Sequence, residues 1–441
     1  MFTPRKLAKH YRELISSIGF LPSLLSVVFL LFAFICIILE YHPVFTKLKE
    51  VISFVLIDSP DNARTILSIL IGSTISLTVF SFSMVMIVLN QASSALSPRV
   101  IPGLITRKSH QIVLGVYLGS IIYSIILLIN LKQTNQGVPS LSILFSLLFG
   151  LLCLALFVFF IHSISKAIQV DNVLNDLFIH TKNELDNIKQ HQQNTDSPDM
   201  PDFSQWYGIK SKYAGYYKGV NTNKLCKILE QNNLRLFICV KQGYFTVEGY
   251  PFLKSSQDLS TNPELQDEIL SCFVFYVEEF ISDHYRYGLT QISEIAVKAM
   301  SPGINDPGTA LKAIDMLSIL LIKRLDIKDV NYSFNHAKEK PWLFFHETSL
   351  MELLHDNFSP IRYYAKTDAV VMSNLLEAIK NILFVARQNQ EAINILCQYL
   401  ESVVFDIKTH ISNPFDLNEI QAMLTEIEEI LPKNHPCQLK I

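Results

Sequence analysis

Several sequence patterns that identify enzymes are missing from this chain of 441 residues. It has no glycine-rich loop that could cradle a phosphate, and no nucleophile stands at motif spacing from a base. The formal net charge is −3, without the basic surplus typical of nucleic-acid binding. We therefore expect no catalytic residue, no cofactor and no nucleic-acid partner.

Cysteine is sparse, and no two cysteines have the spacing of zinc ligands or of a redox dithiol. Their number is odd and their positions are scattered, which predicts buried thiols in a reducing compartment. The seven are Cys36, Cys153, Cys226, Cys239, Cys272, Cys397 and Cys437.

Two short patterns resemble metal sites but lack ligands. His346-Glu347 has Leu350 where a zincin needs its second histidine. Glu352-x-x-His355 stands alone, whereas a di-iron bundle needs a second such pair and two more glutamates. We interpret these residues as solvated positions on a helix face, and expect no metal.

Charged side chains are absent from Thr65–Pro98. A helix of that length, at about 1.5 Å per residue, exceeds a hydrocarbon layer of about 30 Å. The segment is nevertheless polar, and a helical period places seven residues on or near one face. These candidate pore-lining residues are Ser73, Ser76, Phe80, Ser83, Ile87, Asn90 and Ser94.

Two interpretations of this polar face remain open. Small polar residues allow membrane helices to pack closely, which is their commoner use. Alternatively, the face lines a path for water or ions, with Phe80 and Ile87 as an apolar constriction. Either way, hydrocarbon gives these side chains no partner beyond their own backbone.

The residues 14–165 are expected to form four transmembrane helices, at about 18–39, 65–92, 111–131 and 141–164, after a basic segment at 1–13. Lysine and arginine are somewhat more frequent in the N-terminal segment and the second loop than in the first and third loops. The positive-inside rule then places both termini in the cytoplasm.

The rest of the chain is expected to be cytoplasmic and mostly helical, with a small β-unit. We expect a helical extension and linker at 166–202, a β-containing unit at 203–256 and a helical domain at 257–441. Within these, Tyr244–Leu253 is predicted as one strand and Leu265–His284 as one helix. The predicted fold is thus a helical integral membrane protein with an α+β tail.

The segment Ser301–Ala310 is typical of a break between two helices. Pro302-Gly303 ends the first helix, while Asp306 and Pro307 suit the cap and first position of the second. An alternative is a loop that holds an anion, with Ser301, Asn305 and Asp306 as candidates, although Asp306 would repel the anion. The capping interpretation is favoured because it needs no ligand.

Three blocks of sequence resemble one known family. They are the segment ending Gln91-Ala92-Ser93-Ser94 with Ser97-Pro98-Arg99, then Gly243–Leu253, then Tyr287–Ala310 with its Ser301-Pro302-Gly303-Ile304-Asn305-Asp306-Pro307 core. The sequence is similar to the bacterial predicted membrane proteins grouped as domain of unknown function 2254. This resemblance implies a bacterial inner-membrane protein with four spans and a cytoplasmic region, and carries no activity.

The function predicted first is an oligomeric ion channel or pore, because four helices are too few to enclose a wide path in one subunit. Its partners would be the lipid bilayer, further copies of the chain and a small ion or solute. The alternative is a membrane-anchored sensor or scaffold whose cytoplasmic region binds a protein or a small ligand.

Overall fold

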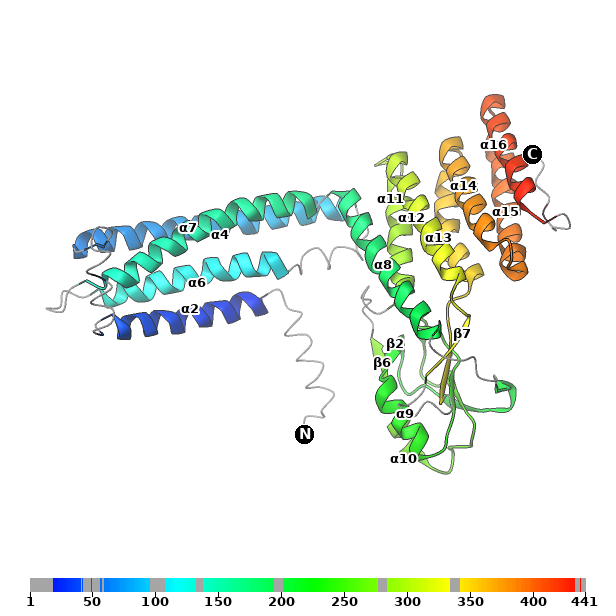
Figure 1. The fold of residues 1–441 in the computed structure, drawn as a ribbon, viewed down its shortest axis with the longest axis horizontal. Helices are drawn as coiled ribbons and strands as arrows, with labels where there is room; N and C mark the ends of the chain where they lie inside the picture. The colour runs from blue at the N-terminus through cyan, green and yellow to red at the C-terminus, as the bar shows by residue number, and fades with distance from the viewer. Residues whose placement is uncertain are drawn as a thin grey trace. The chain divides into compact units, whose positions relative to one another are not determined.

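Figure 1 shows the protein as a computed structural model. The structure describes residues 19–40, 42, 49, 56–57, 59–95, 108–131, 138–167, 169–193, 201–276, 284–333, 342–432 and 437. The chain divides into two compact units, Met1–Asn172 and Val173–Ile441. Each unit is described by itself, as unit 1 and unit 2.

In the described part of unit 1, the long helices lie side by side (Figure 1). They are α2 (Phe20–Leu39), α4 (Pro60–Ala95), α6 (Lys108–Asn130) and α7 (Ser140–Ala167). Helix α6 contacts the other three, and α4 also contacts α7. Consistent with this central position, α6 has the largest buried fraction of the four.

Close approach between α2 and α6 depends on two glycines one helical turn apart. A Cβ at Gly115 would come within 2.6 Å of Leu25 Cδ1, and one at Gly119 within 2.6 Å of the Phe29 ring. This is the small-residue spacing that lets membrane helices pack tightly. Further contact between α6 and α7 comes from a buried hydroxyl pair, Ser124 and Ser146, at 2.7 Å.

Glu40 follows α2 directly, and its carboxylate caps the start of α7. It accepts hydrogen bonds from the amides of Leu141 and Ser142, both at 3.1 Å, and from the Ser142 hydroxyl. Lys49 pairs with the same carboxylate at 2.7 Å. A carboxylate at a helix N-terminus satisfies free amides and favours the helix dipole. Glu40 is therefore stabilised although it is only 1% exposed.

Five described helices are long and apolar enough to cross a membrane, one more than the four predicted from the sequence. The fifth is α14 (Ala369–Ala386) in unit 2. It contacts α12, α15 and α16, and half of its residues are buried inside the protein. A buried core helix and a membrane span share the same composition, so sequence alone cannot separate them.

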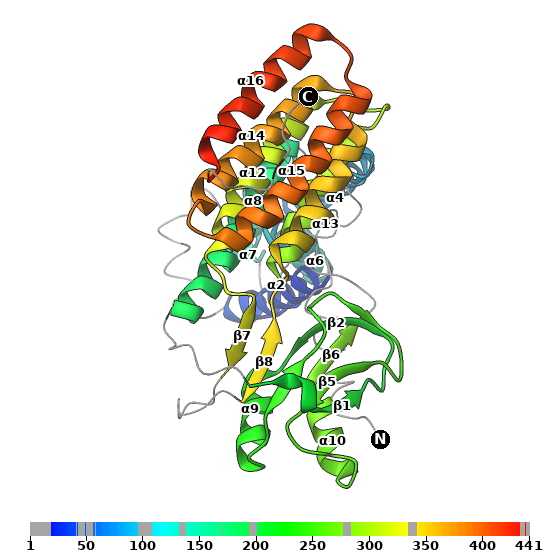
Figure 2. The same ribbon diagram turned by 90° about the vertical axis from the view of Figure 1, so that its right-hand side faces the viewer.

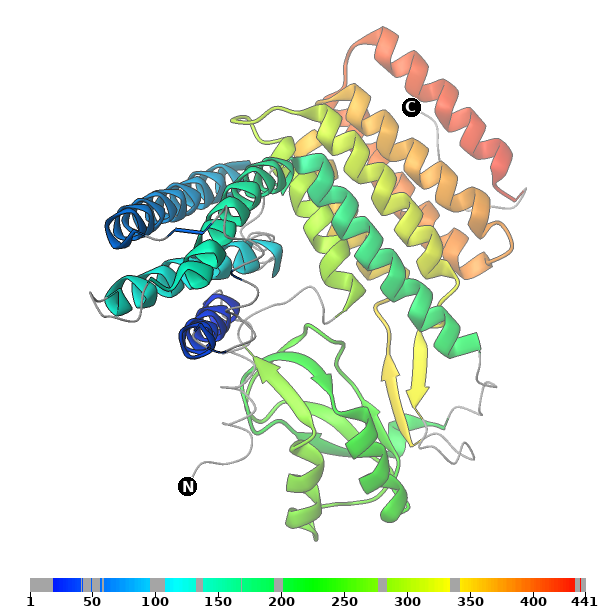
Figure 3. The same cartoon turned by 60° about the vertical axis from the view of Figure 1, so that its left-hand side comes forward.

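The helices of unit 2 pack together in more than one layer, seen in Figure 2 and from another side in Figure 3. Helix α8 buries Leu174, Leu177, Thr181 and Leu185 at helical spacing, which is the amphipathic pattern of a surface helix. The bounds are α8 (Val170–Gln193), α11 (Tyr285–Ala299), α12 (Pro307–Leu325), α13 (Leu350–Ala365), α15 (Gln390–His410) and α16 (Pro414–Ile430).

Two small sheets complete unit 2. One has the strand order β1-β5-β3-β8-β7, with β3 and β8 parallel, and the other has the order β4-β2-β6. The elements are η2 (Phe203–Gln205), β1 (Tyr207–Lys210), β2 (Gly215–Val220), α9 (Thr222–Gln231), β3 (Leu236–Ile238), β4 (Phe245–Thr246), β5 (Pro251–Ser255), α10 (Pro263–Leu270), β6 (Phe273–Tyr276), β7 (Val330–Ser333) and β8 (Leu343–His346).

The structure corrects two predicted elements. Tyr244–Leu253 is not one strand, because the left-handed backbone of Gly249, at φ 84°, turns the chain between β4 and β5. Leu265–His284 is not one helix, because α10 ends at Leu270 and the aromatic and β-branched run Phe273–Tyr276 pairs with β2. Strands β6, β7 and β8 all follow residue 256, so the sheets include residues outside the range 203–256.

The prediction that all cysteines are free thiols is also wrong. Cys397 of α15 and Cys437 form a disulfide, 40 residues apart in sequence. Cys153, Cys226 and Cys272 are buried thiols as expected, and burial raises the pKa of the Cys226 thiol to about 11. The spacing rule fails for Cys397 and Cys437 because their pairing is long-range.

Candidate functional site

The predicted pore-lining residues lie on the exposed side of α4. We call Ser73, Ser76, Phe80, Ser83, Ile87, Asn90 and Ser94 the α4 stripe; the Ser94 side chain falls outside the described residues. The six other side chains are exposed on unit 1. The buried face of α4 instead contains Ala63, Leu67, Thr74, Thr78, Ser81, Val88 and Ala92, on the opposite side of the helix at 3.6 residues per turn.

Each described serine of the α4 stripe donates its hydroxyl hydrogen to its own helix. Ser73 bonds to the Ile69 carbonyl at 2.8 Å, Ser76 to Gly72 at 3.0 Å and Ser83 to Val79 at 3.0 Å. A hydroxyl committed in this way still has oxygen lone pairs to offer. The stripe therefore presents hydrogen-bond acceptors outward.

Two aromatic residues of α4 are similarly exposed but point in different directions. Phe80, on the stripe, is 50% exposed, and its ring meets that of Phe157 on α7 at 5.6 Å between centroids. Phe82 is 48% exposed and lies off the stripe by the helical period. Phe80 and Phe82 thus provide a matched pair for separating the stripe from the neighbouring face.

The Ser301–Asp306 segment forms the corner between α11 and α12. Asp306 caps α12 by accepting hydrogen bonds from the amide of Thr309 at 3.2 Å and from its hydroxyl at 2.6 Å. The predicted cap is thereby confirmed, with Pro307 at the first helical position. Ser301 donates to the Lys298 carbonyl, and Asn305 adopts a left-handed backbone at φ 49°. The anion-binding role of Ser301, Asn305 and Asp306 stays a prediction.

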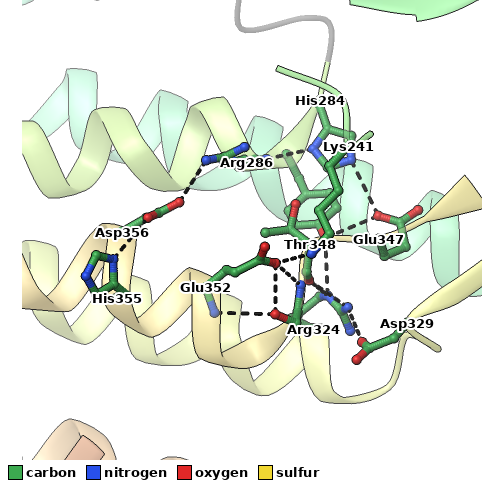
Figure 4. Close-up of polar contacts among 12 residues, drawn as sticks. Lys241, His284, Arg286, Arg324, Asp329, Glu347, Thr348, Glu352, His355 and Asp356 are labelled. Atoms are coloured by element: carbon green, nitrogen blue, oxygen red, sulfur yellow. Dashed lines mark hydrogen bonds and ion pairs between the residues drawn. The ribbon is translucent and has the colours of Figure 1, made fainter. Parts of the chain in front are cut away.

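A second cluster of polar residues joins the helices of unit 2 to the five-stranded sheet (Figure 4). Its centre is Arg324 at the end of α12, which is 3% exposed. The guanidinium donates to the carbonyls of Ile327 and Thr348, to the Tyr285 hydroxyl, and to the Asp329 carboxylate at 2.5 Å. Burial opposes its charge, but Tyr285 and Asp329 outweigh burial and raise the Arg324 pKa.

Beside Arg324, a buried carboxylate meets a histidine and a tyrosine. Glu347 accepts a hydrogen bond from the Tyr285 hydroxyl at 3.2 Å and lies 3.4 Å from His284 Nε2. His284 also caps α11, because its Nδ1 accepts the Arg286 amide. Both ring nitrogens of His284 are therefore engaged. Burial raises the Tyr285 pKa, and the nearby Glu347 adds to the shift.

Charged pairs surround this buried centre, as Figure 4 shows. Lys241 pairs with Glu352, and Arg286 pairs with Asp356 at 2.8 Å. Glu352 also forms a capping box with Ser349 at the start of α13. Burial would raise the Glu352 pKa, but the bonds from Lys241 and Ser349 outweigh burial and lower it.

This cluster corrects the interpretation of two patterns as solvated helix-face residues. Glu347 is buried at the junction, His346 ends a strand, and Glu352 is a capping residue; of the four, His355 alone is mostly exposed. Among the described residues, no group of three or more His, Cys, Asp or Glu could hold a metal ion. The cluster's polar atoms bind one another, which suits a structural joint better than a site for substrate.

Comparison with known proteins agrees with a membrane protein. The family described as "Predicted membrane protein (DUF2254)" matches residues 15–381. Uncharacterized proteins of Mycobacterium bovis and Mycobacterium tuberculosis are each 22% identical over 339 residues, or 74% of this chain. The match spans 64% of the length of these relatives. No solved structure matches the chain at a significant level.

Proposed function

Because this chain belongs to the family of predicted membrane proteins DUF2254, we propose that it assembles in the membrane as an oligomeric cation pore. The observation that carries the proposal is the exposure of the α4 stripe. Its polar side chains are not covered by α6 and α7 of the same subunit. Polar groups at membrane depth are stable where they meet protein or water. Copies of α4 around a common axis would supply both.

The stripe's hydrogen bonding favours cations as the conducted species. Ser73, Ser76 and Ser83 direct their hydroxyl hydrogens into the helix, so lone pairs face outward. Oxygen lone pairs can replace part of the hydration shell of a cation. Thr65–Pro98 contains no charged residue of either sign, so the preference for cations rests on these oxygen atoms. Phe80 and Ile87 would form an apolar constriction that gates by dewetting.

We also propose where the protein lies in the cell and what unit 2 does. Both termini would lie in the cytoplasm of a bacterium, with unit 1 in the inner membrane. Unit 2 would regulate the pore without catalysing a reaction, because its polar cluster is engaged in internal hydrogen bonds and ion pairs.

Assembly around α4 can be tested by photocrosslinking in native membranes. A benzophenone amino acid at Phe80 is expected to give adducts at multiples of the subunit mass. The same residue at Phe82, equally exposed but off the stripe, is expected to react with lipid. No subunit adduct at Phe80, or equal adducts at both positions, would refute assembly around the stripe.

Conduction is tested separately with the purified chain in liposomes. We expect a potassium flux that Phe80→Ala increases, because the constriction widens, and that Ser83→Val decreases, because an acceptor is lost. Phe82→Ala should leave the flux unchanged. Absence of flux at every pH and voltage tried would end the pore proposal, even if subunits crosslink.

A second candidate function is a membrane-anchored sensor or scaffold. It is favoured by the same serine hydroxyls, because hydrogen bonds to their own helix let them pack without water. In that case the α4 stripe is a seam between subunits. Subunit crosslinks at Phe80 without any ion flux would identify this function.

A further inference from the structure

One segment of unit 2 holds apolar and aromatic side chains outward. We call this segment, Tyr244–Tyr250, the aromatic hairpin; it contains β4, which pairs with β2, and a tight turn in which the Tyr250 amide donates to the Val247 carbonyl. Phe245 is 50% exposed and Val247 54%, with Tyr244 and Tyr250 also exposed. Thr246 between them is buried and donates to the Gly215 carbonyl. The alternation places one residue inward and its neighbours outward, as expected for an edge strand.

Backbone hydrogen bonds fix the hairpin at both ends, so its side chains are held in their exposed positions. At one end, the amide of Gly243 donates to the Tyr217 carbonyl at 2.7 Å, and the Tyr217 amide donates to Tyr244 at 2.9 Å. At the other, Gly249 donates to Ser211, and Ser211 donates to Tyr250, both at 2.8 Å. Gly243 and Gly249 have the left-handed backbone that these turns require.

The exposed rings lie in two contacting pairs. The rings of Tyr244 and Tyr250 lie 5.8 Å apart, and that of Phe245 meets Tyr216 edge-on at 5.0 Å. Such a cluster on a soluble surface indicates a contact with a membrane or a partner. Rings that combine an apolar body with a hydroxyl are enriched where membrane meets water.

We propose that the aromatic hairpin docks on the surface of the bilayer that contains unit 1. The covalent link favours this occupant, because only residues 168 and 169 separate α7 from α8, on which unit 2 begins. A short link keeps the bilayer at a high effective concentration for unit 2. Docking at this hairpin would limit the orientations of unit 2, whether or not α4 forms a pore.

The charges of the hairpin specify the kind of lipid. Glu248 is the charged residue within Tyr244–Tyr250, and it is exposed. An exposed carboxylate gains nothing from anionic lipids. The contact therefore rests on ring insertion, and neutral phosphatidylcholine is sufficient for it.

Fluorescence quenching in proteoliposomes tests this contact on the full chain. Tyr244→Trp places a reporter in the hairpin, and Tyr363→Trp, also at an exposed tyrosine, is the matched control on α13. In phosphatidylcholine brominated on its acyl chains, the added emission at position 244 is expected to fall about twofold relative to plain lipid, because interfacial side chains sit within reach of the chains. The emission added at position 363 should not change.

Three outcomes would overturn docking on lipid. The first is no quenching at position 244, and the second is equal quenching at both positions. The third is an emission spectrum of the tryptophan at position 244 that changes with the protein-to-lipid ratio but is not quenched by bromine. That result would indicate that the hairpin contacts a second copy of the chain. As a second measurement, Phe245→Ser with Val247→Ser should abolish the quenching at position 244. The melting temperature should fall by only a few degrees, since both side chains are about half exposed and only the contact of Phe245 with Tyr216 is lost.

Discussion

Gly288 provides a sharp test of how α8 packs against α11. A Cβ at this position would lie 1.8 Å from Thr181 Oγ1 and 3.0 Å from Thr181 Cβ. Thr181 is buried, and its hydroxyl is bonded to the Leu177 carbonyl at 2.7 Å. An ordinary contact between these atoms needs about 3.5 Å. Gly288→Ala must therefore move α8 or rotate a side chain that is held in place.

Gly288→Ala is expected to destabilise the protein, although alanine is intrinsically a better helix former than glycine. In an open helical position, replacing glycine with alanine stabilises by about 1 kcal/mol. Overpacking a tight contact costs about 1–3 kcal/mol. With a clash this short we take the upper end, so Gly288→Ala should lower the free energy of unfolding by about 2 kcal/mol after the gain in propensity. The melting temperature should fall by about 4–8 °C for a unit of this size.

A double-mutant cycle on the purified full chain checks the cause. Thr181→Ala removes the clashing hydroxyl, so the penalty of Gly288→Ala should shrink by at least about 1 kcal/mol in that background. Gly303→Ala is the control, because nothing lies within 4 Å of a Cβ at Gly303. Additive effects, or a stabilised Gly288→Ala variant, would refute the packing of α8 on α11 described above.

Three further predictions concern stability, each read from melting temperatures of the full chain. Cys397→Ser with Cys437→Ser, or a reductant on the parent protein, should cost about 4 kcal/mol, because the disulfide closes a 40-residue loop. The double variant should not respond to reductant. Glu352→Gln should cost about 0.5 kcal/mol at pH 7. Because the native pKa of Glu352 is lowered, this difference should persist above the ordinary value of 4.5 and vanish as the pH falls through the lowered pKa. Thr348→Val should stabilise by about 1 kcal/mol, because the Thr348 hydroxyl is buried and has no partner among the described residues.

Local patterns in the sequence predict local structure well. The Asp306 cap is found where the pattern places it, because a cap depends on neighbours within a few residues. The long uncharged segment likewise becomes α4, extended to Pro60–Ala95. The structure starts it at Pro60, and the Ser59 hydroxyl accepts the Asn62 amide at 3.5 Å, a common pattern at helix starts.

Long-range pairing is what the sequence does not reveal. Strand β8 pairs with β3 about one hundred residues earlier in the chain, Glu40 caps a helix at Leu141, and Arg324 organises the junction from a position that reads as an ordinary helix end. Each contact joins residues with no common local pattern. For α4, the period separates two faces, but it does not say which polar set is buried; the structure buries Thr74, Thr78 and Ser81 and exposes the stripe.

The disulfide requires an oxidising compartment, whereas the proposed orientation places unit 2 in the reducing cytoplasm. One measurement can distinguish the two. Disulfides persist in oxidising compartments and are reduced in the bacterial cytoplasm. If unit 2 is cytoplasmic, as the distribution of lysine and arginine favours, Cys397 and Cys437 should be alkylated as free thiols in growing cells and should pair only after a disulfide donor is added. Trapping thiols in intact cells, followed by mass analysis of the two peptides, distinguishes the two states. A pair that is already oxidised in growing cells would place unit 2 on the oxidising side of the membrane and reverse the orientation proposed for every span.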